Sequence, residues 1–155
     1  MIRGDAANIA KKMRLIVFIT ALLLTGGVVA DLDPIDAGRG FISGLRAYEA
    51  GEFEHAAELF EAVMVVQPNC ARCAHLLGKS YGRQTEQAGW TEAMRLAKKT
   101  RLALEHAVAL APNDARPIED LIKYYRSAPR FLGGSNKKAD ELEQRLQRFR
   151  ANDTS

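Results

Sequence analysis

Cys70 and Cys73 form a CxxC motif, the pattern in this sequence that points most directly to chemistry. A cysteine in the first turn of a helix meets the positive end of the helix dipole, which favours its thiolate, and a helix is predicted to begin at Ala71. The pair is therefore a candidate thiol–disulfide redox site or a candidate local disulfide. A third interpretation also fits, in which both cysteines are small apolar residues of the helix.

The histidines do not complete a metal or haem site around this motif. Attachment of a c-type haem requires a histidine directly after the second cysteine, whereas Ala74 follows Cys73 and His75 comes one residue later. A structural zinc site needs two further ligands at suitable spacing, and the sequence holds no second CxxC motif. We therefore predict no metal ligands and no cofactor.

Other patterns typical of catalysis are weak. The sequence has no Gly-x-Ser-x-Gly nucleophile elbow. The paired carboxylates Glu119-Asp120 and Asp140-Glu141 are adjacent on predicted helices, so they point in different directions and suit solvated faces. Gly133-Gly134-Ser135 lacks the spacing of a phosphate-binding loop and fits a glycine turn before a capped helix. The sequence thus predicts no catalytic residues and favours a binding scaffold over an enzyme.

The excess positive charge lies at the N-terminus. Residues 1–30 hold four of the 22 Lys and Arg residues and one of the 19 acidic residues, so residues 31–155 carry 18 of each. The net charge of +3 therefore belongs to the N-terminal segment. A nucleic-acid-binding domain needs surplus positive charge on its folded part, and the balance in residues 31–155 argues against that class.

Residues 1–30 have the order of a secretory signal. Lys11, Lys12 and Arg14 precede the uncharged run 15–30, which ends in the small residues Val-Val-Ala. The run of 16 residues is shorter than the roughly 20 that span a bilayer as a helix. We predict a cleaved signal peptide over residues 1–30 and export to a bacterial periplasm. The alternatives are an uncleaved anchor formed by residues 15–30, which would make the protein a membrane-tethered assembly factor, and a buried core helix.

Residues 31–155 read as a single all-α domain. No stretch alternates with the period of two that marks a strand, and the apolar residues recur with helical spacing. Glycine and proline positions divide the pattern into predicted helices over residues 37–50, 53–66, 71–83, 90–110, 117–126 and 136–150.

The helices carry an internal repeat. A Pro-Asn pair follows the second predicted helix at Pro68 and the fourth at Pro112, and each next helix carries a tyrosine, Tyr81 or Tyr125. The first pair of helices also shows a spaced set of small and aromatic residues, Gly44, Gly51, Phe53, Ala56 and Phe60, and the second pair shows Leu77, Gly78 and Ala107.

This pattern resembles the tetratricopeptide repeat, in which small residues let two antiparallel helices approach each other. The resemblance is good over residues 37–82, partial over 83–112 and looser over 113–150. It implies an α-α superhelix of about three helical hairpins. The chain departs from the family between Tyr81 and Pro112, where an insertion or a lengthened helix is needed, and at 128–135, where the third hairpin is interrupted. An unrelated helix bundle is the competing interpretation.

Stacked hairpins present the first helix of each pair to a concave groove, and three faces are predicted to line it. Residues three or four apart on a helix share a face, which gives a mainly apolar set on the first hairpin and basic sets on the next two: Phe41, Leu45 and Tyr48; Arg72, His75, Lys79 and Arg83; Arg116, Lys123 and Arg126. The predicted groove is apolar at one end and basic at the other, and suits a protein or peptide partner with an apolar anchor and acidic groups. The competing interpretation is an ordinary charged face, because long basic side chains also cover apolar surface.

Overall fold

The computed structural model describes residues 34–153, and this part of the chain is all-α. The elements are α2 (Pro34–Glu49), α3 (Phe53–Val66), α4 (Ala71–Thr85), α5 (Trp90–Leu110), α6 (Ala115–Ser127), the short 3₁₀ turn η1 (Arg130–Leu132) and α7 (Asn136–Asp153).

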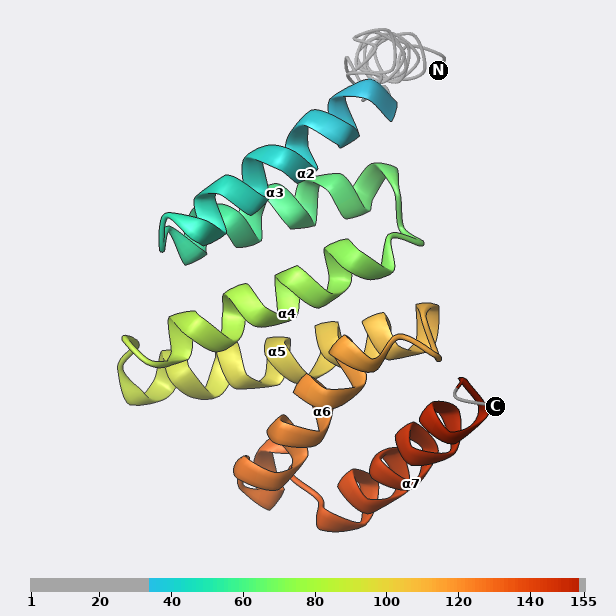
Figure 1. Ribbon diagram of the computed structural model, residues 1–155. Helices are drawn as coiled ribbons and strands as arrows, with labels where there is room; N and C mark the ends of the chain where they lie inside the picture. Colours follow the sequence, from blue (N-terminus) through green and yellow to red (C-terminus); the bar gives the residue numbers. More distant parts are fainter. Residues whose placement is uncertain (1–33, 154–155) are drawn as a thin grey trace, which may run out of the picture. The chain divides into compact units, whose positions relative to one another are not determined.

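The predicted all-α class is confirmed. Both ends of each predicted helix lie within a few residues of the ends of an observed helix. Each helix packs against the next along the chain, and α2 also contacts α4, so that α2–α3 and α4–α5 form successive hairpins (Figure 1). The long spacing between Tyr81 and Pro112 comes from a lengthened helix, because α5 has 21 residues whereas α3 has 14.

Close contact within the first two hairpins depends on glycine. A Cβ atom added to Gly44 of α2 would lie 2.9 Å from Phe60 Cε1 of α3, and one added to Gly78 of α4 would lie 2.9 Å from Leu104 Cγ of α5. The two glycines are 34 residues apart, which is a period found in helical repeats. The same arrangement of a glycine against a large apolar side chain therefore closes both hairpins.

Between the first two hairpins, a tyrosine, a glutamate and a lysine from three helices meet. Tyr81 of α4 donates its hydroxyl hydrogen bond to the Glu61 carboxylate of α3. The Lys99 ammonium of α5 lies 3.2 Å from Glu61 Oε1 and 4.5 Å from the centroid of the Tyr81 ring. We call this arrangement a Glu–Tyr–Lys joint.

A second Glu–Tyr–Lys joint connects the α4–α5 hairpin to the next one. Tyr125 of α6 donates to Glu105 Oε1 of α5 at 2.6 Å, and the Lys138 ammonium of α7 lies 3.9 Å from the same oxygen and 5.2 Å from the Tyr125 ring centroid. In both joints the tyrosine follows the glutamate by 20 residues. Burial and the hydrogen bond to Glu105 raise the pKa of the Tyr125 hydroxyl, which keeps it protonated as a donor.

The predicted interruption of the third hairpin is an ordered turn. Tyr124 donates its hydroxyl hydrogen bond to the Leu132 carbonyl at 2.9 Å, and the Ser135 N–H donates to the Tyr125 carbonyl at 2.9 Å. Gly133 has φ +95°, a conformation that favours glycine. Ser135 then caps α7 as predicted, its Oγ accepting from the Lys138 N–H at 3.3 Å.

The predicted signal segment, residues 1–30, lies outside the described residues. Among the helices of residues 34–153, none combines the length and the apolar character that a membrane span requires.

Replacing Gly78 by alanine should destabilise the protein by about 1–3 kcal/mol, because the new methyl group overlaps Leu104. The measurement is the free energy of unfolding in urea, followed by circular dichroism. Gly82, one turn further along α4, provides a matched control, since a Cβ atom there would meet Thr100 at an ordinary 3.7 Å. Gly82→Ala should be neutral or stabilising by up to about 1 kcal/mol through helix propensity. Equal effects of the two substitutions would contradict the proposed role of the Gly78–Leu104 contact.

Candidate binding groove between α4 and α6

A groove of about 470 Å³ lies between α4 and α6. One wall is α4, the other is α6, and the base is α5, the helix that packs against both. The residues between α6 and η1, together with Leu132, close one end. The polar and aromatic side chains that line the groove are Tyr48, Lys79, Arg83, Thr85, Glu86, Thr100, Asp120, Lys123, Tyr124 and Ser127.

The base of the groove is formed by small or apolar groups. Ala97 and Leu104 line it from α5, and Gly78 and Gly82 line it from α4. The hydroxyl of Thr100 donates to the Leu96 carbonyl of its own helix at 2.9 Å, so this hydrogen-bond donor is already used. An apolar side chain of a partner therefore meets no unpaired polar group at the Thr100 hydroxyl.

The charged side chains at the rim are mostly paired. Arg83 lies 3.0 Å from Glu86, and Lys123 lies 3.2 Å from Asp120. Within residues 34–153, Lys79 has no carboxylate at ion-pair distance, and its ammonium lies 5.3 Å from the centroid of the Tyr48 ring. The rim therefore carries one uncompensated positive charge, at Lys79.

A half-buried hydrogen bond between His75 and Asp120 connects α4 to α6 beside the groove. His75 Nε2 and Asp120 Oδ2 are 2.8 Å apart, and His75 donates because an ionised carboxylate only accepts. Both side chains are largely covered, with exposed fractions of 12% and 27%. The hydrogen bond from His75, followed by that from Lys123, holds the pKa of Asp120 below its usual range despite partial burial.

The predicted division into an apolar end and a basic end is not what the structure shows. Arg72 of α4 stacks over the Phe41 ring of α2 at 5.0 Å. Seven residues further along α4, the Lys79 ammonium lies 5.3 Å from the centroid of the Tyr48 ring of α2. The basic and aromatic sets therefore interleave, because α2 and α4 are neighbours and cations are attracted to aromatic faces.

Of the residues predicted to line a groove, Tyr48, Lys79, Arg83 and Lys123 do so. The others have different surroundings. Leu45 packs against the core of the first two hairpins, Arg116 pairs with Asp114 at the start of α6, and Arg126 pairs with Asp140 and Glu143 of α7. Arg126 of α6 is thus directed to α7, and the spacing of residues on one helix does not reveal this contact.

Three contributions to the groove were missed from the sequence. The sequence predicts Asp120 as part of a solvated acidic pair, and it gives Tyr124 and Leu132 no place in a site. The signal for Asp120 was its spacing of three residues from Lys123 on one helix face. Leu132 had no such signal, because its position depends on the turn that follows α6.

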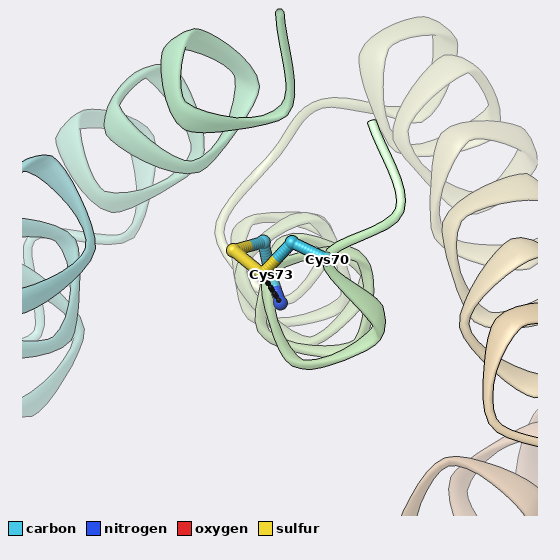
Figure 2. Close-up of a disulfide and its surroundings, with 2 residues drawn as sticks. All are labelled: Cys70 and Cys73. Carbon is cyan, nitrogen blue, oxygen red and sulfur yellow. Dashed lines mark hydrogen bonds between the residues drawn. A yellow bond between two sulfur atoms is a disulfide. The ribbon is translucent and has the colours of Figure 1, made fainter. Parts of the chain in front are cut away.

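The two cysteines are bonded to each other at the start of α4, with Sγ atoms 1.99 Å apart (Figure 2).

A second hollow, of about 630 Å³, lies between α3 and α5, and Glu52, Glu54, Glu58 and Glu92 are among the residues that line it. Among residues 34–153, no three His, Cys, Asp or Glu side chains are grouped so that they could hold a metal ion.

Comparison with known proteins gives no family assignment. No family model matches the chain, and no curated protein matches it in sequence.

Replacing Asp120 by asparagine should lower the free energy of unfolding at neutral pH by about 1–2 kcal/mol, because the charge-assisted bond from His75 is lost. A carboxyl group whose pKa is lowered on folding stabilises the fold above its unfolded pKa of about 3.9, and this contribution disappears as the pH falls through the folded value. The difference between wild type and variant should therefore be full at pH 7 and decline as the pH falls below about 4, towards the lowered pKa of the folded state.

Urea titrations across that pH range test this expectation. Asp36→Asn is the control, because Asp36 pairs only across an exposed 3.5 Å contact with Arg39 of the same helix. Its effect should stay within about 0.5 kcal/mol at every pH. A pH-independent loss in Asp120→Asn would contradict the role assigned to the ionised Asp120 carboxylate.

Proposed function

We propose that this protein is an exported, tetratricopeptide-like scaffold that binds a segment of a partner protein in the groove between α4 and α6. The partner segment carries an acidic side chain close to an apolar one. The scaffold itself performs no catalysis in this role.

The observation that carries this proposal is the environment of Lys79. Its ammonium is at the groove rim, is positioned over the Tyr48 ring and has no carboxylate partner within residues 34–153. A cation held over an aromatic ring keeps its charge and loses side-chain freedom. It is therefore prepared for an acidic group of a partner.

The base of the groove supports the apolar half of the partner. Ala97 at the base and Leu132 at the closed end offer apolar surface within the same hollow as Lys79, above the buried Leu104. Apolar burial supplies affinity, whereas the single charge favours one orientation and one class of partner.

The likeness to tetratricopeptide proteins is supported by features beyond the sequence pattern. Two hairpins are closed by equivalent glycines 34 residues apart, and two Glu–Tyr–Lys joints connect successive units. Export to a periplasm rests on the order of charges and apolar residues in residues 1–30. If residues 15–30 are retained, the same groove would serve a membrane-tethered assembly factor.

Selection from a displayed library of random peptides against the full chain should yield peptides that combine an acidic and an apolar residue. Lys79→Glu should weaken the selected peptide by about tenfold, since one attractive charge becomes repulsive. Ala97→Phe should weaken it as well, because the larger side chain fills the base of the groove. Titration calorimetry measures both effects.

Lys98→Glu provides the matched control, because Lys98 is exposed on α5 and lies outside the groove. It makes the same change in net charge and should alter the affinity by less than about twofold. Equal weakening by the Lys79 and Lys98 substitutions would reduce the effect to net charge and contradict the proposed site. Failure to select any peptide would contradict the groove itself.

A further inference from the structure

The disulfide lies at the N-terminal end of α4, and its two sulfurs have different surroundings. Cys70 is the residue that caps the helix, and Cys73 belongs to its first turn. The Cys73 N–H donates to Cys70 Sγ at 3.1 Å, the contact drawn as a dashed line in Figure 2. One sulfur of the pair therefore already receives a hydrogen bond from the helix end.

The two cysteines differ in access to solvent. Cys73 is 1% exposed and packs with Ala37 of α2 and Val63 of α3. Cys70 is half-buried and follows an exposed connection, residues 67–69. A reagent or a partner can thus approach Cys70 from the connection, whereas Cys73 is covered by the first hairpin.

The charges around the first turn of α4 favour a negative sulfur at Cys70. The turn contains no acidic residue, and Arg72 lies between the two cysteines. The N-terminal end of a helix carries partial positive charge from its unpaired N–H groups. A thiolate released at Cys70 would keep the hydrogen bond from Cys73 and be favoured by the partial positive charge of the helix end.

A purely structural role accounts poorly for this bond. The cysteines are only three residues apart, so the bond closes a very short loop and constrains the unfolded chain little. The helix start is also held by backbone contacts, since the Cys70 N–H donates to the Gln67 carbonyl and the Ala74 N–H donates to the Cys70 carbonyl. Neither of these backbone hydrogen bonds involves a sulfur atom.

We propose that Cys70–Cys73 is an exchange-active disulfide that oxidises dithiols, with Cys70 as the sulfur that is attacked and Cys73 as the buried leaving sulfur. The site takes a dithiol, in a small molecule or in a protein, as its reductant. This activity goes beyond the groove and does not depend on what the groove binds.

The exchange proceeds in two balanced steps. A thiolate of the dithiol attacks Cys70 Sγ, a mixed disulfide forms, the Cys70–Cys73 bond breaks, and the Cys73 sulfur leaves as a thiolate that takes a proton from water. The second thiol of the dithiol loses its proton to water. The resulting thiolate attacks the other sulfur of the same dithiol, the one bonded to Cys70 in the mixed disulfide. Cys70 is then released as a thiolate, so two electrons pass to the cysteine pair and the dithiol becomes a disulfide.

Single-cysteine variants of the full chain test the assignment of roles. An aromatic disulfide that releases a coloured thiolate serves as the probe, and its reaction is followed at pH 6 and pH 7. Cys73→Ala, which leaves Cys70, should react at least about tenfold faster than Cys70→Ala, which leaves the covered Cys73. Unfolding both variants in urea should remove the difference. Equal rates in the folded proteins, or a faster Cys73, would overturn the proposal.

A measurement on the wild-type chain covers the case in which a variant fails to fold. The oxidised protein is treated with dithiothreitol, quenched briefly with iodoacetamide and digested for mass spectrometry. Reduction should occur while the circular dichroism spectrum stays native, and Cys70 should be alkylated before Cys73. Resistance to the dithiol until the protein unfolds would overturn the proposal. Neither readout involves a peptide or the groove, so a failure here is distinguishable from a failure of the proposed binding site.

Discussion

The contact of Gly78 with Leu104 sets the distance between α4 and α5, and the rest of the described structure is arranged around that pair. α4 also packs against α2 and α3, and its residue His75 reaches Asp120 of α6. One helix therefore carries the disulfide at its start, a groove wall along its length and the tyrosine of the first Glu–Tyr–Lys joint. A shift of α4 by the width of a methyl group would disturb all three, so we expect a side chain at position 78 to disturb the structure more than one at position 82.

Most of the basic side chains that were predicted to line the groove have a structural role. Arg72 stacks on Phe41, Arg126 connects α6 to α7, and Arg116 pairs near the start of its own helix. Long cationic side chains can cover apolar surface and still keep their charge in water, so a basic stripe in a sequence does not identify a free binding surface. Pairing within residues 34–153 leaves Lys79 as the cation at the groove rim that faces no carboxylate. That distinction needs the positions of partners from other helices.

The helices could be predicted from the sequence because their signals are local. Gly51 and Pro68 mark helix ends, and the buried face of α3 repeats with helical spacing. The groove could be predicted only in part, because its lining comes from four helices and a turn. Tyr48 and Lys79 were found from face periodicity, whereas Leu132 is placed by a hydrogen bond from Tyr124 that spans the turn. The cysteine motif was visible in the sequence, but the different burial of its two sulfurs depends on packing with Ala37 and Val63.

The Glu–Tyr–Lys joints have a consequence for how the protein unfolds. Each joint draws its glutamate from one hairpin and its tyrosine and lysine from the two helices of the next, so it is complete only when three helices are in place. In a chain of helical units, cooperativity is governed by the coupling between neighbours relative to the stability of each unit. A coupling that spans three helices penalises states in which one hairpin frays while its neighbour stays folded. The joints therefore favour a single concerted transition over stepwise loss of hairpins from either end.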